Sequence, residues 1–261
     1  MIGALVGDIV GSRFEFRNSK SKDFDLFTDL SVATDDSVMT LAVASALMRN
    51  YREKIDLGEA AVEEMQRFGR LYPDAGYGGM FVGWLESDDP RPYNSFGNGA
   101  AMRVSPVGWA ARNEDEVREW SQTVTAVTHN HPEGLRGAES VAMAIYLLRQ
   151  GMNKEQLKAR IEKDYGYDLS KTVDEIRPTY SFDVTCQGTV PQAFAAFFDS
   201  ADFEDVIRNA VSLGGDSDTI AAIAGSIAQP FFGVPDDIRV STCARLDEFQ
   251  RKVLNDFEHF I

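Results

Sequence analysis

The stretch Leu213-Gly-Gly-Asp216-Ser-Asp218-Thr219-Ile220 places two carboxylates and a hydroxyl at the start of an apolar helical pattern. Gly214-Gly215 interrupts the helix before it, and the pattern then predicts a buried helix from about Asp216 toward Pro230. Free N–H groups and the positive end of the helix dipole favour carboxylates in a first turn. One capping Asp is ordinary, whereas two in one turn suggest a site. The apolar residues at helical spacing are Ile220, Ile223, Ala224 and Ile227.

The composition is typical of a globular protein with an acidic surface. The chain has 261 residues, 44% hydrophobic content and 17 Phe, which suffices for one large core, so we expect a single domain over residues 1–261. The net charge of −15 argues against a nucleic-acid partner. No stretch resembles a signal peptide or a membrane span, so we expect no membrane partner and a cytoplasmic location. We further expect a monomer.

Helical patterns follow one another along the chain, and no run of alternating β-branched residues indicates a sheet. The sequence therefore predicts an all-α fold. The polar stretch Ser19–Leu30 is expected to be a loop that covers a site. The expected helices span about 1–11, 35–46, 57–71, 80–86, 114–128, 132–148, 153–165, 190–198, 203–213 and 216–230, with a further helical pattern toward Ile261.

A second acidic helix start occurs at Thr34-Asp35-Asp36, where Thr34 is expected as the N-cap. If this helix lies beside the one at Asp216, four carboxylates converge, and their burial without counter-charge is very costly. Neither motif contains Arg, Lys, His or Cys, so oxygen-binding divalent cations are the expected compensation. Two such cations could share a bridging carboxylate.

Other motifs are less specific. Glu15 lies between two aromatic residues, either on the surface or on a pocket wall. The glycine-rich loop around Tyr77 could approach a ligand, and Gly97-Asn-Gly99 offers backbone N–H groups of the kind that bind anions. His129 ends a helical pattern, a position at which histidine is usually structural.

Five motifs, in this order, resemble the ADP-ribosylglycohydrolase family and cover nearly the whole chain. They are Gly3-Ala-Leu-Val-Gly-Asp8, Thr34-Asp-Asp36, Gly97-Asn-Gly-Ala-Ala-Met-Arg103, Thr128-His129 and Gly214-Gly-Asp-Ser-Asp-Thr219. The resemblance implies a compact single-domain orthogonal bundle of helices, with two Mg²⁺ or Mn²⁺ ions in a cleft that binds ADP-ribose. The implied metal ligands are Thr34, Asp35, Asp36, Asp216, Asp218 and Thr219.

The implied reaction is hydrolysis at ribose C1″, which releases ADP-ribose from an arginine or serine side chain of a protein or from a small ADP-ribosyl metabolite. Such cleavage passes through an oxocarbenium-like state. Glu15 resembles the family's glutamate and is the first candidate for proton transfer, with Asp35 and Asp36 as further catalytic candidates. The implied substrate-binding residues are Tyr77, Gly97, Asn98, Gly99 and His129.

Two alternatives remain at this point. A phosphatase of the haloacid-dehalogenase type also has a short acidic motif ending in Thr, but the spacing here is wrong and the motif follows a Gly-Gly turn. A catalytically inactive ADP-ribose binder, or a structural crystallin-like relative, is the stronger alternative. Because every implied acidic ligand position is filled, we favour catalysis. The sequence alone does not separate arginine, serine and metabolite acceptors.

Overall fold

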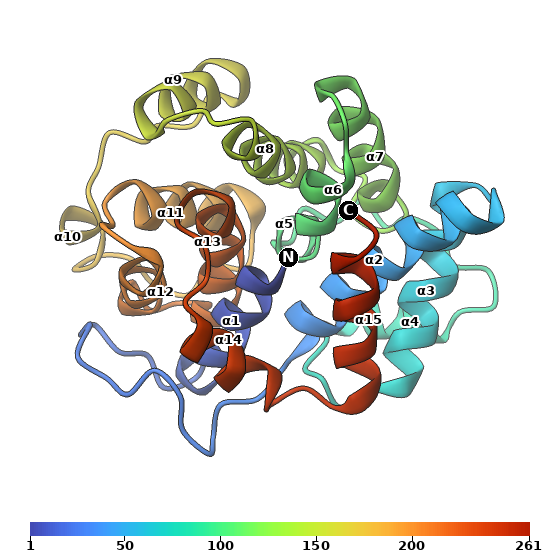
Figure 1. Cartoon of the computed structure of the whole chain (residues 1–261), viewed down its shortest axis with the longest axis horizontal. Coiled ribbons are helices and arrows are strands. Elements are labelled where there is room, and N and C mark those ends of the chain that lie inside the picture. The colour runs from blue at the N-terminus through green and yellow to red at the C-terminus, as the bar shows by residue number, and fades with distance from the viewer.

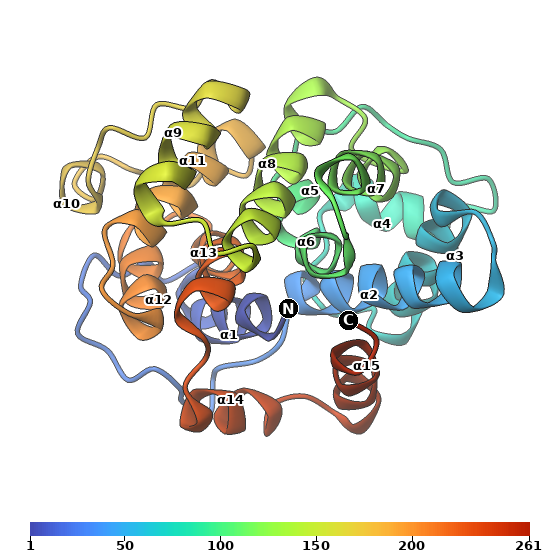
Figure 2. The same ribbon diagram turned by 45° about the horizontal axis from the view of Figure 1, so that its top comes forward.

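The computed structural model describes residues 1–261 and is built from helices, with one isolated antiparallel bridge between Gly97 and Thr185 (Figures 1 and 2). The all-α prediction is confirmed. The helices are α1 (Ile2–Gly11), the 3₁₀ helix η1 (Ser12–Phe14), α2 (Asp35–Glu53), α3 (Leu57–Leu71), α4 (Gly79–Glu86), α5 (Gly99–Met102), α6 (Ser105–Ala110), α7 (Glu114–Ala126), α8 (Pro132–Arg149), α9 (Lys154–Tyr165), α10 (Val173–Ile176), α11 (Cys186–Phe198), α12 (Phe203–Ser212), α13 (Ser217–Phe232), α14 (Asp236–Cys243) and α15 (Glu248–Glu258).

Helices α1 and α13 form the centre of the fold, and small residues let their backbones approach closely. Gly3, Gly7 and Gly11 recur every four residues and so lie on one face of α1. A Cβ on Gly7 would lie 2.0 Å from the carbonyl oxygen of Ala221, and one on Gly11 would lie 2.4 Å from the Cα of Asp218. Only glycine permits this contact, which brings the end of α1 against the acidic start of α13.

The other helices surround this central pair. Helix α13 also packs against α8, α11 and α12, whereas α1 contacts α2, which in turn packs against α3, α6 and α15 (Figure 2). The buried apolar side chains form one cluster of 71 residues that runs from Met1 to Phe257. Elements from both ends of the chain therefore contribute to the same core.

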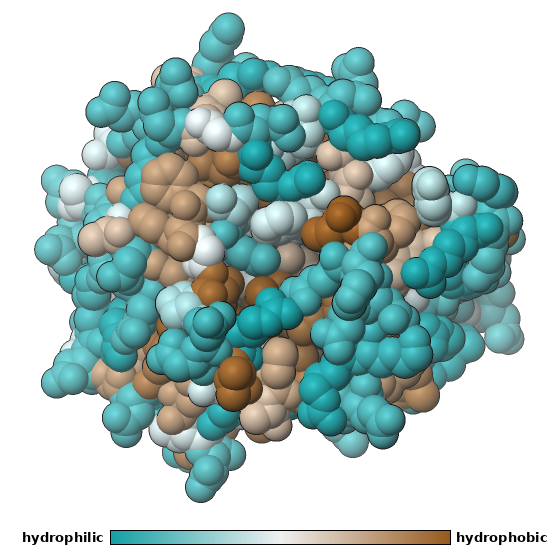
Figure 3. All heavy atoms as spheres, viewed as in Figure 1, coloured by the Kyte–Doolittle hydropathy of each residue, from teal (hydrophilic) through white to brown (hydrophobic).

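The surface is mainly polar, as expected for a chain rich in charged residues. The face in Figure 3 is mostly hydrophilic, with hydrophobic residues in small groups. None of the helices combines the length and the hydropathy that a bilayer crossing requires.

Two short helices were not expected from the sequence, α6 and α10. Helix α6 contains Pro106 and Gly108, residues with low intrinsic helix propensity. A Cβ on Gly108 would lie 2.6 Å from the carbonyl oxygen of Ala142 in α8. Tertiary packing on α8 thus stabilises this turn, and such packing is invisible in a local pattern.

Candidate functional site

The two acidic helix starts meet at a cavity of about 400 Å³, a size typical of small-molecule sites. The carboxylates come from the segment after η1, from α2 and from the start of α13. A second group of lining residues comes from the loop before α5, from α5 and from the end of α7. The acidic group comprises Glu15, Asp35, Asp36, Asp216 and Asp218, together with the hydroxyl of Thr219.

The carboxylates form two groups that share one residue. Oxygens of Asp8, Asp36 and Asp218 lie within 4.8 Å of one another, as do oxygens of Glu15, Asp216 and Asp218. No Lys or Arg makes an ion pair with any of these five residues. The cluster is therefore strongly anionic, and Asp218 occupies the position of a carboxylate that could bridge two cations.

This crowding changes the protonation of the cluster. Burial, reinforced by the charges of Asp8 and Asp216, raises the pKa of Asp35 to about 7. Burial likewise raises the pKa of Glu15 to about 7, with the nearby charges of Asp216 and Asp8 adding to the effect. The pKa of Asp218 is raised well above its ordinary value, first by burial and then by Asp216. Without cations, complete ionisation of all the carboxylates in this cluster is unfavourable in the folded protein.

Asp8 was not assigned a role from the sequence, although it lies at the centre of the site. Its buried carboxylate accepts hydrogen bonds from the Thr34 N–H at 2.9 Å and the Ser37 N–H at 3.1 Å, and from both hydroxyls. Asp8 in α1 therefore caps α2 across the interhelical contact. Thr34 occupies the N-cap position as expected, but its side chain makes no capping bond and donates to Asp8 instead. Thr34 does not line the cavity.

Asp36 offers a buried oxygen without a partner. Its Oδ2 accepts a hydrogen bond of 3.2 Å from the Thr219 hydroxyl, whereas its Oδ1 is buried and has no hydrogen-bond partner. An unpaired carboxylate oxygen inside a protein is costly unless a cation or a donor engages it. Together with the all-oxygen donor set and the missing counter-charge, this oxygen shows that the residues present fit divalent cations such as Mg²⁺ or Mn²⁺.

Asn18 anchors the Glu15 segment to the glycine turn before α13. Its side-chain amide donates to the carbonyl oxygens of Glu15 and Gly215, both at 2.9 Å, and its Oδ1 accepts from the Gly215 N–H at 2.8 Å. Gly214 and Gly215 have φ angles of +69° and +71°, a conformation that favours glycine. This turn orients Asp216, and Asn18 holds Glu15 at a fixed place beside it.

Asn98 links the acidic group to the second group of lining residues. Its side-chain amide donates to Asp216 at 2.6 Å and to Thr189 at 3.1 Å, and its N–H donates to the carbonyl of Val184 at 2.8 Å. The loop that carries Gly97 and Asn98 is thus held between α11 and α13. Of the residues predicted to bind substrate, Gly97, Asn98, Gly99 and His129 line the cavity.

Tyr77 lies outside the cavity lining, which includes its neighbours Gly76 and Gly78 instead. The Tyr77 ring packs against Phe81, with the ring centroids 5.6 Å apart, and its hydroxyl is buried without a partner. Phe81 lines the cavity and presents an apolar surface there. Tyr77, implied as a substrate-binding residue, therefore lies behind Phe81, which faces the cavity in its place.

Arg103 is a second residue to which the sequence analysis gave no role. It is 1% exposed, lines the cavity and forms no salt bridge, and its guanidinium lies 5.5 Å from the centre of the Phe81 ring. Burial lowers its pKa to about 10, so it stays charged at neutral pH. Its Nη2 contacts Thr128 and His129, which places a positive charge directly behind the substrate-binding group.

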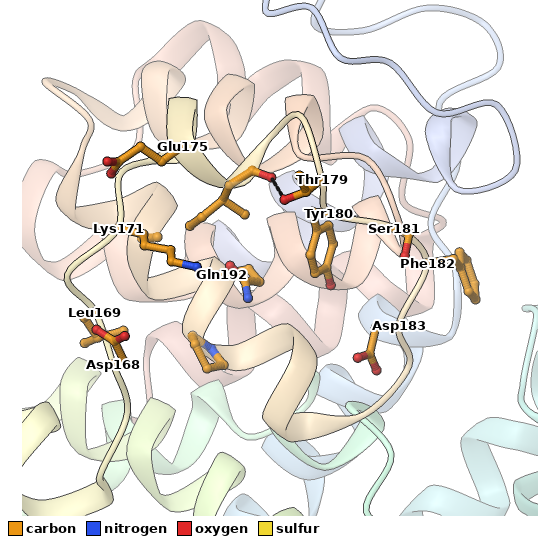
Figure 4. Close-up of a pocket in the computed structure, with 13 residues that line it drawn as sticks. Asp168, Leu169, Lys171, Glu175, Thr179, Tyr180, Ser181, Phe182, Asp183 and Gln192 are labelled. Carbon is orange, nitrogen blue, oxygen red and sulfur yellow. Dashed lines mark hydrogen bonds between the residues drawn. The ribbon is translucent and has the colours of Figure 1, made fainter.

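A second cavity, of about 370 Å³, lies between α10 and α11 (Figure 4). Its charged residues carry both signs, and of these Asp168, Lys171 and Glu175 are exposed whereas Asp183 is half-buried. No cluster of metal-ligating side chains includes its residues. The acidic cavity is therefore the candidate active site.

Comparisons with known proteins agree with this choice. The family model described as ADP-ribosylglycohydrolase matches residues 1–257. The chain is similar to "ADP-ribosylhydrolase ARH3" of Bos taurus, with 26% identity over an alignment that covers 90% of this chain and 84% of the relative. It is also similar to "ADP-ribosylarginine hydrolase Tri1" of Pseudomonas putida, with 27% identity over 90% of this chain and 70% of that protein.

A solved structure, described as an "ADP-ribosylglycohydrolase-related protein complex", shares the fold. Its TM-score is 0.70 at 23% identity, over 97% of this chain and 92% of that one. The family match covers both acidic helix starts, the loop of Gly97 and the helix end at His129. The chain therefore belongs to the ADP-ribosylglycohydrolase family.

Proposed function

We propose that the protein hydrolyses the bond between ribose C1″ of ADP-ribose and an acceptor group, and that it requires two Mg²⁺ or Mn²⁺ ions. The observation that carries this proposal is the buried acidic cluster at a cavity of about 400 Å³, whose Asp36 Oδ1 has no partner. The names of the relatives support the same activity. We further propose that residues 1–261 act as one domain and as a monomer.

The proposed cation ligands are those implied by the sequence, with Asp218 between the two sites. Asp8 is better suited to a supporting role, because its oxygens already accept hydrogen bonds from Thr34 and Ser37. Bound there, the cations would compensate the carboxylate charge and polarise the ribose hydroxyls. The proposed ligand set is Thr34, Asp35, Asp36, Asp216, Asp218 and Thr219.

Glu15 is the proposed proton acceptor for the attacking water. It lines the cavity, is half-buried and lies beside Asp216 and Asp218. Asn18 restricts the segment that carries it, which keeps a carboxylate within reach of the reacting bond. Asp35 and Asp36 remain further candidates for proton transfer, since they line the same cavity.

The surroundings of the cavity favour an acceptor on a polypeptide. Met80 and Val184 line the cavity and are 68% and 49% exposed, and Phe16, next to Glu15, is 83% exposed. Exposed apolar side chains around a site are typical of a surface that contacts another macromolecule. We therefore favour an ADP-ribosylated arginine or serine over a small metabolite.

The test compares three substrates with the purified protein in Mg²⁺ or Mn²⁺: an arginine-linked peptide, a serine-linked peptide and O-acetyl-ADP-ribose. We expect ADP-ribose to be released from one of the peptides and not by an Asp218→Asn control. Release from the metabolite alone would contradict the polypeptide acceptor. Binding of ADP-ribose without release from any substrate would favour the inactive ADP-ribose-binding or crystallin-like alternative.

A further inference from the structure

The contacts of Arg103 determine the hydrogen-bonding state of His129. Nη2 of Arg103 lies 3.2 Å from Nδ1 of His129 and also donates to the Thr128 hydroxyl. The Thr128 hydroxyl oxygen lies 2.7 Å from the same Nδ1. The side chains of Arg103 and Thr128 are at most 1% exposed, and His129 is 6% exposed, so bulk water does not compete at this place.

A guanidinium has only N–H donors and accepts no hydrogen bond. Nδ1 must therefore be the acceptor, which leaves the proton of the neutral imidazole on Nε2. The Thr128 hydroxyl supports this assignment, because it accepts from Arg103 and can donate its own hydrogen to Nδ1. In a doubly protonated ring, Nδ1–H would face the N–H donors of Arg103, and the two positive groups would repel each other. Burial and the charge of Arg103 both lower the pKa of His129, in agreement with a neutral ring.

The protonated Nε2 lies beside Gly97 and Gly99, which line the cavity together with His129. A Cβ on Gly97 or on Gly99 would lie 3.4 Å from Nε2. Nε2 makes no hydrogen bond within the protein, although His129 lines the cavity. The Gly97–Gly99 loop is itself fixed, because the N–H of Asn98 donates to the carbonyl of Val184 and the N–H of Cys186 to that of Phe96. The donor direction of Nε2–H is thus set by the fold.

We propose that Arg103 and Thr128 are positioning residues that hold His129 as a neutral Nε2–H donor aimed into the cavity, where it binds an oxygen of the ligand. The identification of the ligand as ADP-ribose rests on the proposed function, whereas the assignment of the tautomer does not depend on it. Arg103 forms no salt bridge, and its positive charge beside His129 favours a negatively charged ligand oxygen, such as one of the diphosphate. His129 then favours a ligand oxygen that accepts a hydrogen bond and disfavours an ammonium or guanidinium N–H, which has no lone pair to offer.

The first test is nuclear magnetic resonance of the ligand-free protein with ¹⁵N-labelled histidine at neutral pH. The chain has 3 His, so the spectrum is simple, and a His129→Gln variant assigns the signal. We expect Nε2 protonated and Nδ1 unprotonated in His129. His259 is the internal control, because its Nδ1 lies 2.7 Å from the carbonyl of Asn255 and must be protonated. An Nδ1-protonated or doubly protonated His129 would overturn the proposal.

The second test uses variants. Replacing both donors, in Arg103→Met with Thr128→Val, should remove the single tautomer signature and weaken ADP-ribose binding by roughly ten-fold, the scale of one charge-assisted hydrogen bond. Thr128→Val alone should keep the tautomer, because Arg103 still donates to Nδ1. If the double variant does not fold, the spectra of the wild type and of Thr128→Val still test the assigned tautomer of His129. A double variant that folds and keeps the Nε2–H tautomer would contradict the positioning role.

The third test separates the donor from the shape of the ring. His129→Gln retains an N–H donor and should bind ADP-ribose more tightly than His129→Phe, which retains only the ring. Equal affinity of the two variants would show that Nε2–H binds no ligand oxygen. These measurements need no turnover, so a protein that fails to hydrolyse any substrate would refute the proposed function and leave the tautomer assignment intact.

Discussion

Asp218 is the carboxylate on which both halves of the acidic cluster depend. Its oxygens lie near those of Asp36 and of Asp216, and it is 3% exposed. The pKa of Asp218 is raised well above its ordinary value by burial and by Asp216, so its ionised form destabilises the cation-free protein at neutral pH. If Asp218 binds cations as proposed, its side chain serves that binding at the expense of the stability of the fold.

Asp218→Asn should therefore abolish hydrolysis and raise the melting temperature in chelator. The free energy of unfolding should increase, because the neutral amide removes the charge that burial and Asp216 disfavour. Thermal unfolding followed by circular dichroism in EDTA, beside an activity assay in Mg²⁺, measures both effects. A less stable variant would indicate that Asp218 serves mainly to stabilise the start of α13.

The variant Glu15→Gln tests whether Glu15 accepts a proton in the proposed hydrolysis. If Glu15 accepts the proton of the attacking water, kcat should fall by about 10²-fold, because the amide cannot accept that proton. The affinity for ADP-ribose should change little. Steady-state kinetics and calorimetry on one preparation decide this, with Glu86→Gln, an exposed glutamate outside the cavity, as the control. An unchanged kcat would leave Asp35 or Asp36 as the acceptor.

The roles of two residues could not be predicted from the sequence alone. Asp8 and Arg103 lie within the quoted motifs, but the analysis gave neither a role. Their partners, Thr34 and His129, are 26 residues away in each case. Local periodicity predicts which face of a helix is buried and says nothing about what a buried polar group meets. The two acidic helix starts were recognisable from the sequence, because two carboxylates in each first turn exceed what capping requires, whereas their convergence could only be posed there as a condition.

The contact between α1 and α13 is the element on which the site is built. Gly7→Ala would place a Cβ 2.0 Å from the carbonyl oxygen of Ala221, so the helices must separate or the substitution must unfold the protein. Separation would also move Asp8 from Asp218. We expect a loss of about 1–3 kcal/mol or more in the free energy of unfolding, measured by chemical denaturation.

Gly83→Ala is the matched control for this prediction. Gly83 lies in α4, and a Cβ there meets nothing within 4 Å. Alanine is favoured over glycine inside a helix by about 1 kcal/mol, so this variant should be as stable as the wild type or more stable. Equal stability of the Gly7 and Gly83 variants would show that the close approach of α1 to α13 is not essential.

Long helices with clear apolar periodicity were predictable from the sequence, and short ones were not. Helices α3 and α9 lie close to their predicted bounds, since each has a strong pattern and a polar N-cap in Asp56 or Asn153. Helix α6 contradicts local propensity, and it forms because Gly108 fits against α8. The arrangement of the helices followed from the family resemblance and not from the pattern.

The charge of the whole molecule is −15, and the acidic cavity adds to its self-repulsion. The pKa values of Glu15 and Asp35 are raised to about 7 in the folded protein, from ordinary values of 4.5 and 3.8. At pH values between the ordinary and the raised pKa of each group, the folded state therefore binds more protons than the unfolded state. The stabilisation that protonated Glu15 and Asp35 give to the fold is fully present below their unfolded pKa values and is lost as pH rises through about 7.

Without cations, Glu15 and Asp35 should accordingly contribute a fall in the melting temperature between pH 6 and pH 8, whereas the lowered pKa of His129 contributes a rise near the lower end of this range, so the difference between melts with and without cations isolates the carboxylates. Carboxylates whose pKa is lowered, such as Glu64 and Asp205, lose their stabilising effect only at lower pH and do not oppose this trend. Saturating Mg²⁺ or Mn²⁺ should raise the melting temperature and reduce its slope with pH, because cations stabilise the ionised cluster. Parallel melts in EDTA and in Mg²⁺ test this. Identical slopes would contradict cation binding by these carboxylates.

The Asn18 anchor also bears on how this scaffold can diversify. Since Asn18 fastens the backbone at Glu15 to the turn at Gly215, the segment Ser19–Leu30 begins just beyond a fixed point and ends before α2. Lengthening a loop costs only a little more entropy for each added residue, provided that its ends stay in place. Insertions or replacements in this segment can therefore reshape the surface beside α12, where Lys22 pairs with Asp205, while the backbone at Glu15 stays in place.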